Sequence, residues 1–105
     1  MLWLIVAIAV LFILWRWRSS RRIASFKARG AVIVDVRTPE EFHRGHVDGA
    51  LNLPLNQLRD AAKRLDKQKP ILLCCASGTR SALAARQLAA QGFETCNAGP
   101  WTRIR

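Results

Sequence analysis

The sequence predicts an α/β domain with an open parallel sheet flanked by helices, preceded by one transmembrane helix. After residue 30, apolar runs rich in β-branched residues alternate with helical patterns, which is typical of parallel strands joined by crossover helices. The first 15 residues contain no charged side chain, and basic residues follow directly. The 105 residues leave room for one hydrophobic core besides that segment.

Residues 1–17 are predicted to form the transmembrane anchor. The apolar run from Met1 to Trp15 covers roughly 22 Å as a helix, against about 30 Å of bilayer hydrocarbon. Interfacial Trp15 and Trp17, arginines that reach the head groups, and a helix that continues past them compensate for the difference. A cleaved signal peptide is the main alternative. A signal peptide has basic residues before its apolar run and small residues after it, whereas here the arginines follow the apolar run.

The net charge of +10 is concentrated beside this apolar segment. Six basic residues and no acidic residue precede Gly30: Arg16, Arg18, Arg21, Arg22, Lys27 and Arg29. Such a flank is typical of the cytoplasmic side of a span, so we expect a single-pass protein of a bacterial inner membrane, with its domain in the cytoplasm. No basic run interleaved with aromatic residues continues into the domain, so we expect the membrane, and no nucleic acid, as a partner.

Residues 18–30 are predicted to form a basic juxtamembrane linker that runs into a short helix and stops at Gly30. The domain, residues 31–105, begins with a buried strand at 31–36. A helix follows, because Thr38 suits the N-cap, Pro39 suits the first helical position, and Glu41 completes a capping box. Gly45 ends that helix.

The remaining elements are predicted from the spacing of their apolar residues. They are a strand at 50–53, a helix at 54–66, a strand at 71–74, a helix at 81–91 closed by Gly92, and a last strand at 93–97. The helix at 54–66 carries its apolar residues at spacings of three and four, namely Leu55, Leu58, Ala62 and Leu65. The strand at 71–74 is the most apolar of the domain.

The three cysteines indicate a reducing compartment, because an odd number with two neighbours, Cys74 and Cys75, does not suit a disulfide scaffold. No pair of cysteines has CxxC spacing, and the two histidines, His43 and His46, lie on another segment. We therefore expect neither a metal nor a cofactor. Cys74 and Cys96 are interpreted as buried cysteines, with a role as resolving thiols as the alternative.

The candidate site is the segment from Cys75 to Ser81, between a strand and a helix. Ligands of open α/β sheets bind at the carboxyl ends of strands, where the next helix presents free N–H groups and the positive end of its dipole. These donors and Arg80 are expected to lower the pKa of the Cys75 thiol, and small residues at 76–78 let the backbone curl around the sulfur. The same donors suit the outer sulfur of a persulfide. The alternative is that Cys75 is an ordinary buried cysteine.

Three segments resemble signatures of the rhodanese family. Residues 75–81 resemble its active-site loop, residues 34–42 its first signature and residues 45–54 its second, and the resemblance covers residues 24–101. It implies the rhodanese fold and a sulfurtransferase. Such an enzyme moves sulfane sulfur from thiosulfate or a persulfide donor to a thiophilic acceptor, either cyanide or a thiol.

The resemblance also implies roles for single residues. Cys75 is the sulfur acceptor, and Arg80 helps to bind the anionic donor. The rest of the loop binds the substrate: Ala76, Ser77, Gly78, Thr79 and Ser81. Asp35 and Arg37 match a signature pair that either supports the loop or forms a structural ion pair. His46 is expected to be structural, because sulfur transfer to a thiolate needs no general base.

Two other functions stay open. The first is a phosphatase, because the protein tyrosine phosphatase pattern of Cys, five residues, Arg and Ser is formally present from Cys74 to Ser81. A phosphatase loop would start at Cys74, one residue before the rhodanese loop, and Leu73 stands where phosphatases usually have a histidine. A membrane-tethered rhodanese-like module that binds a partner or relays sulfur without its own turnover is the second alternative. The sequence does not decide the oligomeric state or the physiological donor and acceptor.

The end of the sequence departs from the family pattern. Gly99, Pro100 and Trp101 resemble its glycine and tryptophan segment, but four residues follow in place of a closing helix. The packing of this edge of the domain is therefore left open.

Overall fold

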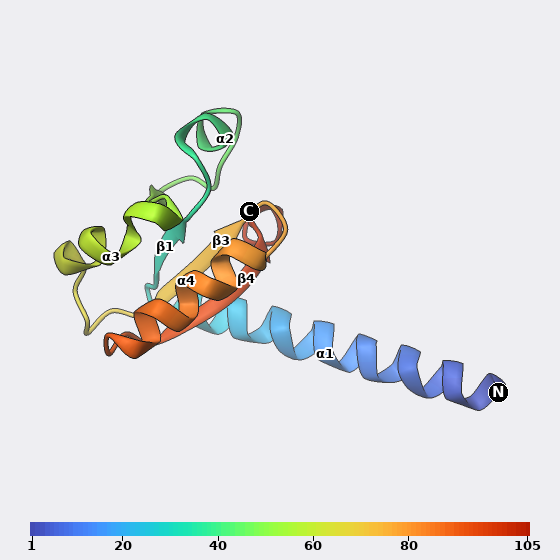
Figure 1. Ribbon diagram of the computed structural model, residues 1–105. Coiled ribbons are helices and arrows are strands. Elements are labelled where there is room, and N and C mark those ends of the chain that lie inside the picture. The colour runs from blue at the N-terminus through green and yellow to red at the C-terminus, as the bar shows by residue number, and fades with distance from the viewer.

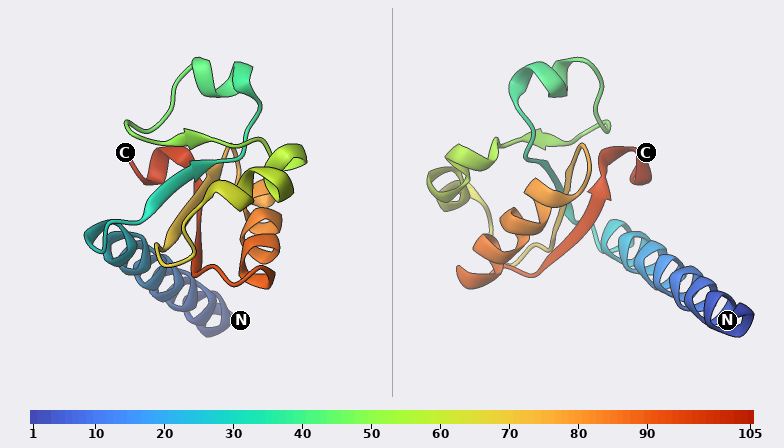
Figure 2. Two further views of the ribbon diagram at one scale, coloured as in Figure 1. Left: turned by 90° about the vertical axis from the view of Figure 1, so that its left-hand side faces the viewer. Right: turned by 45° about the vertical axis from the view of Figure 1, so that its right-hand side comes forward.

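The computed structural model describes all residues, 1–105, with a four-stranded parallel sheet, helices on both of its faces, and one helix that projects from it (Figure 1, Figure 2). The strands are β1 (Val32–Asp35), β2 (Leu51–Asn52), β3 (Ile71–Cys75) and β4 (Thr95–Pro100). Their order is β2-β1-β3-β4, and every neighbouring pair is parallel. The predicted α/β class with an open parallel sheet is confirmed.

Four α-helices and three short 3₁₀ turns connect or flank the strands. The helices are α1 (Leu2–Ala28), α2 (Pro39–His43), α3 (Leu58–Ala61) and α4 (Thr79–Ala90), and the turns are η1 (Leu55–Gln57), η2 (Ala62–Arg64) and η3 (Trp101–Arg103). The capping box is present at α2. The Glu41 N–H donates to the Thr38 hydroxyl at 3.3 Å, and the Glu41 carboxylate accepts from the Thr38 N–H at 3.2 Å.

The single helix predicted at 54–66 is wrong. The structure has η1, α3 and η2 there, because the backbone of Gln57 departs from helical values at φ −112° and ψ −1°, and no side chain caps any of the three turns. Helical turns of either kind keep residues three apart on one side, so Leu58 and Ala62 are still buried as expected. All predicted strands and the helix before Gly92 differ by one to three residues at one end or both; β3 continues to Cys75, α4 begins at Thr79, and β4 runs from Thr95 to Pro100.

β3 forms the centre of the sheet, and all five of its residues are buried. Because side chains alternate along a strand, Ile71, Leu73 and Cys75 belong to one core cluster, whereas Leu72 and Cys74 belong to the other. The first cluster includes residues of β1, α3, α4 and η2: Val34, Leu58, Ala62, Ala84 and Leu88. The second includes residues of α1, β4 and the chain end: Ile23, Phe26, Cys96, Ala98 and Ile104.

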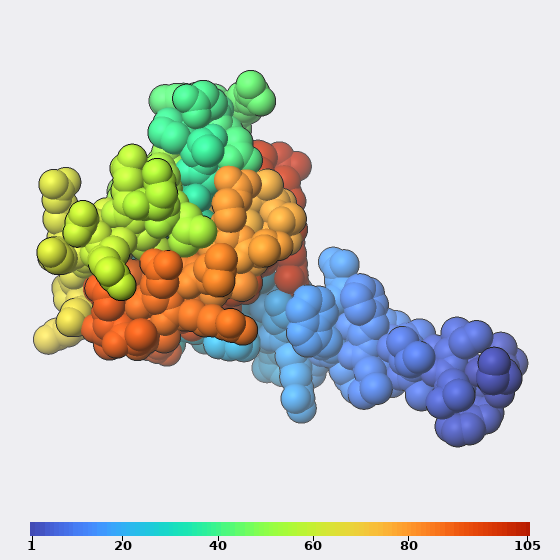
Figure 3. Space-filling view, viewed as in Figure 1, coloured from blue at the N-terminus to red at the C-terminus, as the bar shows by residue number.

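α1 is one continuous helix of 27 residues, with no glycine or proline to interrupt it. Its last turns pack on the sheet through Ile23 and Phe26, whereas the apolar side chains of its N-terminal half are exposed, and that half stands clear of the domain (Figure 3). By length and composition α1 can cross a membrane. The division into anchor (1–17), linker (18–30) and domain (31–105) stays a prediction, and no break in α1 marks its first boundary.

The chain end packs against α1. Ile104 is buried, and its carbonyl oxygen accepts a hydrogen bond from the Lys27 ammonium at 2.9 Å. The Arg103 guanidinium donates to the hydroxyls of Ser19 at 3.1 Å and Ser20 at 3.2 Å. The packing that the sequence left open at this edge is therefore supplied by α1.

Because Phe26 of α1 is buried in the core, removing its side chain is expected to destabilise the whole domain strongly. We expect Phe26→Ala to lower the free energy of unfolding by about 3–5 kcal/mol, because the substitution leaves a cavity beneath β3. The matched truncation Leu83→Ala, at a side chain of α4 that is 49% exposed, is expected to change it by about 0.5 kcal/mol or less. Chemical denaturation of the full-length chain in detergent measures both, and equal losses would contradict the prediction.

Candidate active site

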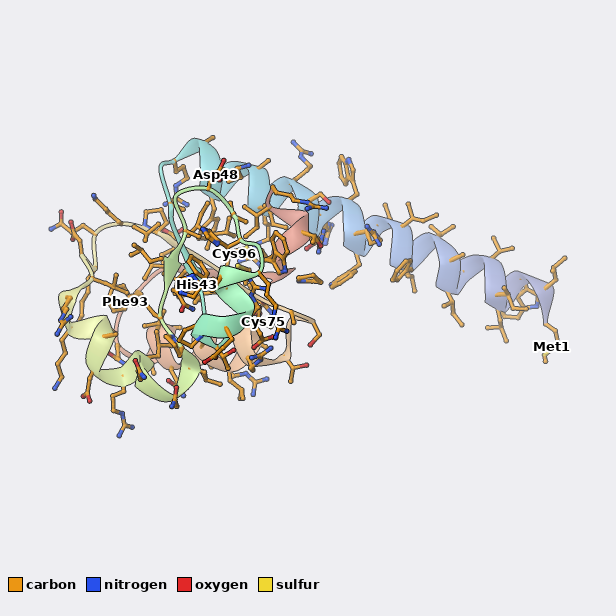
Figure 4. The ribbon with its side chains drawn as sticks, turned by 90° about the horizontal axis from the view of Figure 1, so that it is seen from above. Met1, His43, Asp48, Cys75, Phe93 and Cys96 are labelled. Carbon is orange, nitrogen blue, oxygen red and sulfur yellow. The ribbon has the colours of Figure 1, made fainter.

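Cys75 is the last residue of β3, and residues 76–78 connect it to α4. Figure 4 shows Cys75 apart from Cys96, which lies closer to α1. Of the predicted loop residues, the structure brings Ser77, Gly78 and Ser81 to the Cys75 sulfur, whereas the Arg80 guanidinium pairs with Glu41. Ser81 is buried beneath the sulfur, whereas Ala76, Ser77 and Thr79 are exposed, and the whole Cys75 residue has no exposed surface.

The Cys75 sulfur accepts two hydrogen bonds from its own loop. The Gly78 N–H donates to Sγ at 2.8 Å, and the Ser81 hydroxyl lies 3.3 Å from Sγ. Gly78 has the left-handed φ of 106°, and a Cβ atom there would lie 3.2 Å from the Gly99 Cα of β4. Glycine is therefore required both by the turn that directs its N–H at the sulfur and by the close approach of β4.

The side chain of Asn97, on β4, holds this loop through hydrogen bonds. Its side-chain carbonyl oxygen lies 2.7 Å from the Ser81 hydroxyl and accepts from the Gly99 N–H at 2.9 Å, while its amide donates to the Gly78 carbonyl at 3.2 Å. A register shift makes the contact possible, because Leu73 pairs with Asn97 whereas the next residue of β3 pairs with Gly99. Sequence reasoning missed Asn97, since nothing in the local pattern indicates a bulge there.

The pKa of the Cys75 thiol is lowered, in the direction that the sequence predicted, but the cause lies in the loop donors and not in Arg80, which pairs with Glu41. Burial raises this pKa, but hydrogen bonds from the Ser81 hydroxyl and from the N–H groups of Ser81, Gly78 and Ser77 stabilise the thiolate by more. The arrangement therefore favours a nucleophilic sulfur that is closed off from bulk water.

Arg80 forms a bidentate ion pair with Glu41 of α2. Its guanidinium contacts the two carboxylate oxygens at 2.7 and 3.0 Å. Hydrogen bonds from Arg80 and from the Thr38 N–H lower the pKa of Glu41 to about 2, so the carboxylate stays ionised at neutral pH. Sequence reasoning placed Glu41 only in the capping box and missed this pair, because the partners are 39 residues apart. That Arg80 binds the donor stays a prediction.

Asp35 and Arg37 form a buried bidentate ion pair on the opposite face of the sheet from Cys75. The guanidinium of Arg37 contacts the Asp35 carboxylate at 2.7–3.0 Å, donates to the Gly45 carbonyl at 2.7 Å and lies 5.0 Å from the Trp101 ring. Neither side chain hydrogen-bonds to the loop at 75–81. Of the two roles left open by the sequence, these contacts are those of a structural ion pair.

The other two cysteines have raised pKa values. Burial and the neighbouring Asp35 carboxylate raise the pKa of Cys74 to about 12, and burial raises that of Cys96. Cys74 faces the α1 side of the sheet, away from the loop N–H groups, so the phosphatase register has no stabilised thiolate. The His46 Nδ1–H donates a hydrogen bond to the Phe42 carbonyl oxygen at 2.7 Å, and the imidazole stacks on the Phe42 ring.

Two hollows flank the segment from Cys75 to Ser81, which we call the catalytic loop for the role that the sequence predicts. One, of about 250 Å³, lies between the loop at Ser77–Thr79 and α1, whereas the other, of about 290 Å³, lies beside Arg80 and Leu55. Nowhere do three histidine, cysteine or acidic side chains gather so that they could hold a metal ion.

Comparisons with known proteins agree with this geometry. The family model of the rhodanese-like domain matches residues 21–98. The thiosulfate sulfurtransferase GlpE of Ectopseudomonas mendocina is 36% identical over 75 residues, which are 71% of this chain and 69% of that protein. The Bacillus subtilis protein YqhL is 42% identical over 64 residues, which are 61% of this chain and 51% of that protein.

Solved structures share the fold. A rhodanese with anions from E. coli has a TM-score of 0.63 at 34% identity, covering 70% of this chain and 91% of its own. A rhodanese-like domain protein from Staphylococcus aureus has a TM-score of 0.66 at 32% identity, covering 71% of this chain and 74% of its own.

Replacing Ser81 tests whether its hydroxyl lowers the pKa of the Cys75 thiol. We expect the rate of iodoacetamide alkylation at Cys75 to rise with pH with a midpoint below the usual value of about 8.5 for a free cysteine. Ser81→Ala raises that midpoint, because it removes a donor to the charged sulfur. Ser77→Ala, the matched loss of a hydroxyl outside the hydrogen-bond network, leaves it unchanged. Intact mass over a pH series gives the rates, and one shared midpoint would disprove the role of the Ser81 hydroxyl.

Proposed function

The chain belongs to the rhodanese family, and we propose that it is a sulfurtransferase that carries sulfane sulfur as a persulfide on Cys75. The observation that carries the proposal is the Cys75 sulfur itself, which accepts hydrogen bonds from the Gly78 N–H and the Ser81 hydroxyl and has a lowered pKa. The relatives named thiosulfate sulfurtransferase support the same reaction class.

The proposed reaction has two steps, with thiosulfate or a persulfide as the donor. With thiosulfate, the Cys75 thiolate attacks the sulfane sulfur, the sulfur–sulfur bond of the donor breaks, and sulfite leaves with the bonding pair. Cys75 then holds a persulfide whose outer sulfur is charged. In the second step cyanide or a thiolate attacks that outer sulfur and takes it as thiocyanate or a new persulfide, which regenerates the Cys75 thiolate.

The contacts of Arg80 suggest how the donor reaches the sulfur. Cys75 has no exposed surface, and the Arg80 guanidinium is held by Glu41 beside the hollow that it lines. We infer that an anionic donor exchanges with the Glu41 carboxylate for this guanidinium, because both are oxyanions suited to its paired N–H donors.

We also propose that α1 anchors the domain to a membrane, with the domain on the cytoplasmic side. The exposed apolar half of α1 and the arginines that follow it support this placement. The continuity of α1 favours an anchor over a removable signal sequence, because the same helix continues into the buried contacts of Ile23 and Phe26.

The reaction is tested by thiosulfate-to-cyanide sulfur transfer on the full-length chain in detergent, with intact mass before and after thiosulfate. We expect turnover and the gain of one sulfur atom in the parent and in Cys74→Ser, and neither in Cys75→Ser. Cys74→Ser is the matched control, because it makes the same change at the neighbouring residue on the other face of the sheet.

Other results would identify the alternatives. A folded parent that gains sulfur without turnover would be a relay module, and one that gains none would be a binding module at most. Hydrolysis of an aryl phosphate that Cys74→Ser abolishes would identify a phosphatase.

The Arg80–Glu41 pair is tested through the KM for thiosulfate. Glu41→Gln keeps an acceptor for the capping box but removes the competing charge, so KM is expected to fall by up to about fivefold. Arg80→Gln is expected to raise KM about tenfold or more, because it removes a charge-assisted contact with the donor. The matched control Glu40→Gln alters an exposed acid without a partner and leaves KM unchanged. Unchanged KM in all three variants would exclude donor binding by Arg80.

A further inference from the structure

A groove between α1 and β4 is lined by three arginines. It consists of two hollows of about 250 and 310 Å³ that share Trp15, Ser19 and Asn97 in their walls. Arg103 lines the first hollow, and Arg18 and Arg22 line the second. We call this feature the arginine groove.

The charge of the arginine groove is not neutralised within the chain. None of its three guanidiniums pairs with a carboxylate, since the ion pairs of the chain involve other basic residues. Arg103 donates only to the neutral hydroxyls of Ser19 and Ser20. Arg22 and Arg103 both lower the pKa of Cys96 through their charge, although burial dominates and raises it, so the two guanidiniums lie close to one thiol. The groove therefore presents concentrated positive charge without a counter-ion.

The position of the groove along α1 is fixed by the fold. Because α1 is continuous and packs on the sheet through Ile23 and Phe26, Trp15 and Arg22 stand about 10 Å apart along its axis, next to the exposed apolar half. When that half lies in the hydrocarbon core, the groove lies at the depth of the head groups, which add about 5–8 Å on each side. Trp15 at its edge suits that depth.

We propose that the arginine groove binds the phosphate of an anionic lipid head group. Arginine forks suit phosphate oxygens, and basic pockets on the cytoplasmic side of membrane helices suit anionic lipids. Free phosphate has the same chemistry, but only a lipid has acyl chains to lie along the apolar half of α1. The proposal depends on α1 as an anchor and is independent of sulfur transfer.

The far end of the groove is the catalytic loop. Ser77, Gly78 and Thr79 line the first hollow together with Arg103, and Asn97, shared by both hollows, holds Gly78 and Ser81. A lipid bound there holds the catalytic loop at the membrane surface.

The test is lipid retention by the full-length chain, extracted from mixed phosphatidylglycerol and phosphatidylcholine vesicles and examined by native mass spectrometry. We expect the parent to retain phosphatidylglycerol preferentially, and Arg22→Gln and Arg103→Gln each to weaken that retention about tenfold. The exposed Arg22 guanidinium makes no ion pair within the protein, so its replacement removes no contact that holds the fold together. Arg21→Gln is the matched control at the same depth, because that guanidinium lies over Trp17 outside the groove.

Three results would overturn the proposal. Equal loss in Arg21→Gln would show attraction by diffuse charge, and displacement of the lipid by millimolar inorganic phosphate would show a site for a free anion. A chain that does not float with vesicles would exclude both the lipid site and the anchor. Sulfur transfer is measured separately, so none of these results depends on it.

Discussion

The burial of β3 on both faces is the constraint on which the rest of the structure depends. A strand whose five residues are all buried must send neighbouring side chains into different cores. The consequence is largest at its end, where Cys75 meets the N–H groups that begin α4 and Cys74 meets the Asp35 carboxylate and apolar side chains. Two adjacent thiols thereby acquire pKa shifts of opposite sign, and only the Cys75 sulfur has hydrogen-bond donors that stabilise a thiolate.

The face of β3 that carries Leu72 and Cys74 is covered by α1. The helix that covers the sheet is also the apolar helix that projects from it, so the projecting half of α1 is joined to the domain by continuous helix. Its contacts with Ile104 and Arg103 join α1 to the chain end as well. The loop at 77–79 and Trp15 and Ser19 of α1 line one hollow, so the proposed anchor would hold the proposed sulfur site close to the membrane surface.

The sequence predicted the parts that depend on local patterns. The β-branched run before Asp35, the capping box at Thr38 and the small-residue loop after Cys75 each determine their structure within a few residues, so the sheet and the position of the sulfur were predictable. Asn97 and Glu41 were not, because one contact requires a shift in register between β3 and β4 and the other joins residues 39 apart. The segment at 54–66 differed because spacing of three and four residues suits 3₁₀ turns as well as one helix.

The Ser81 hydroxyl can respond to the charge on the Cys75 sulfur, because it lies between that sulfur and Asn97. Its single proton has three alternative acceptors, the Asn97 carbonyl oxygen at 2.7 Å, the Gly78 carbonyl oxygen at 3.2 Å and the Cys75 sulfur at 3.3 Å. A thiolate attracts the proton by its charge, whereas in the proposed persulfide the inner sulfur is neutral and the proton returns to Asn97. Neither state leaves the buried Ser81 hydroxyl without a partner, so the change of charge at the Cys75 sulfur does not cost an unsatisfied polar group.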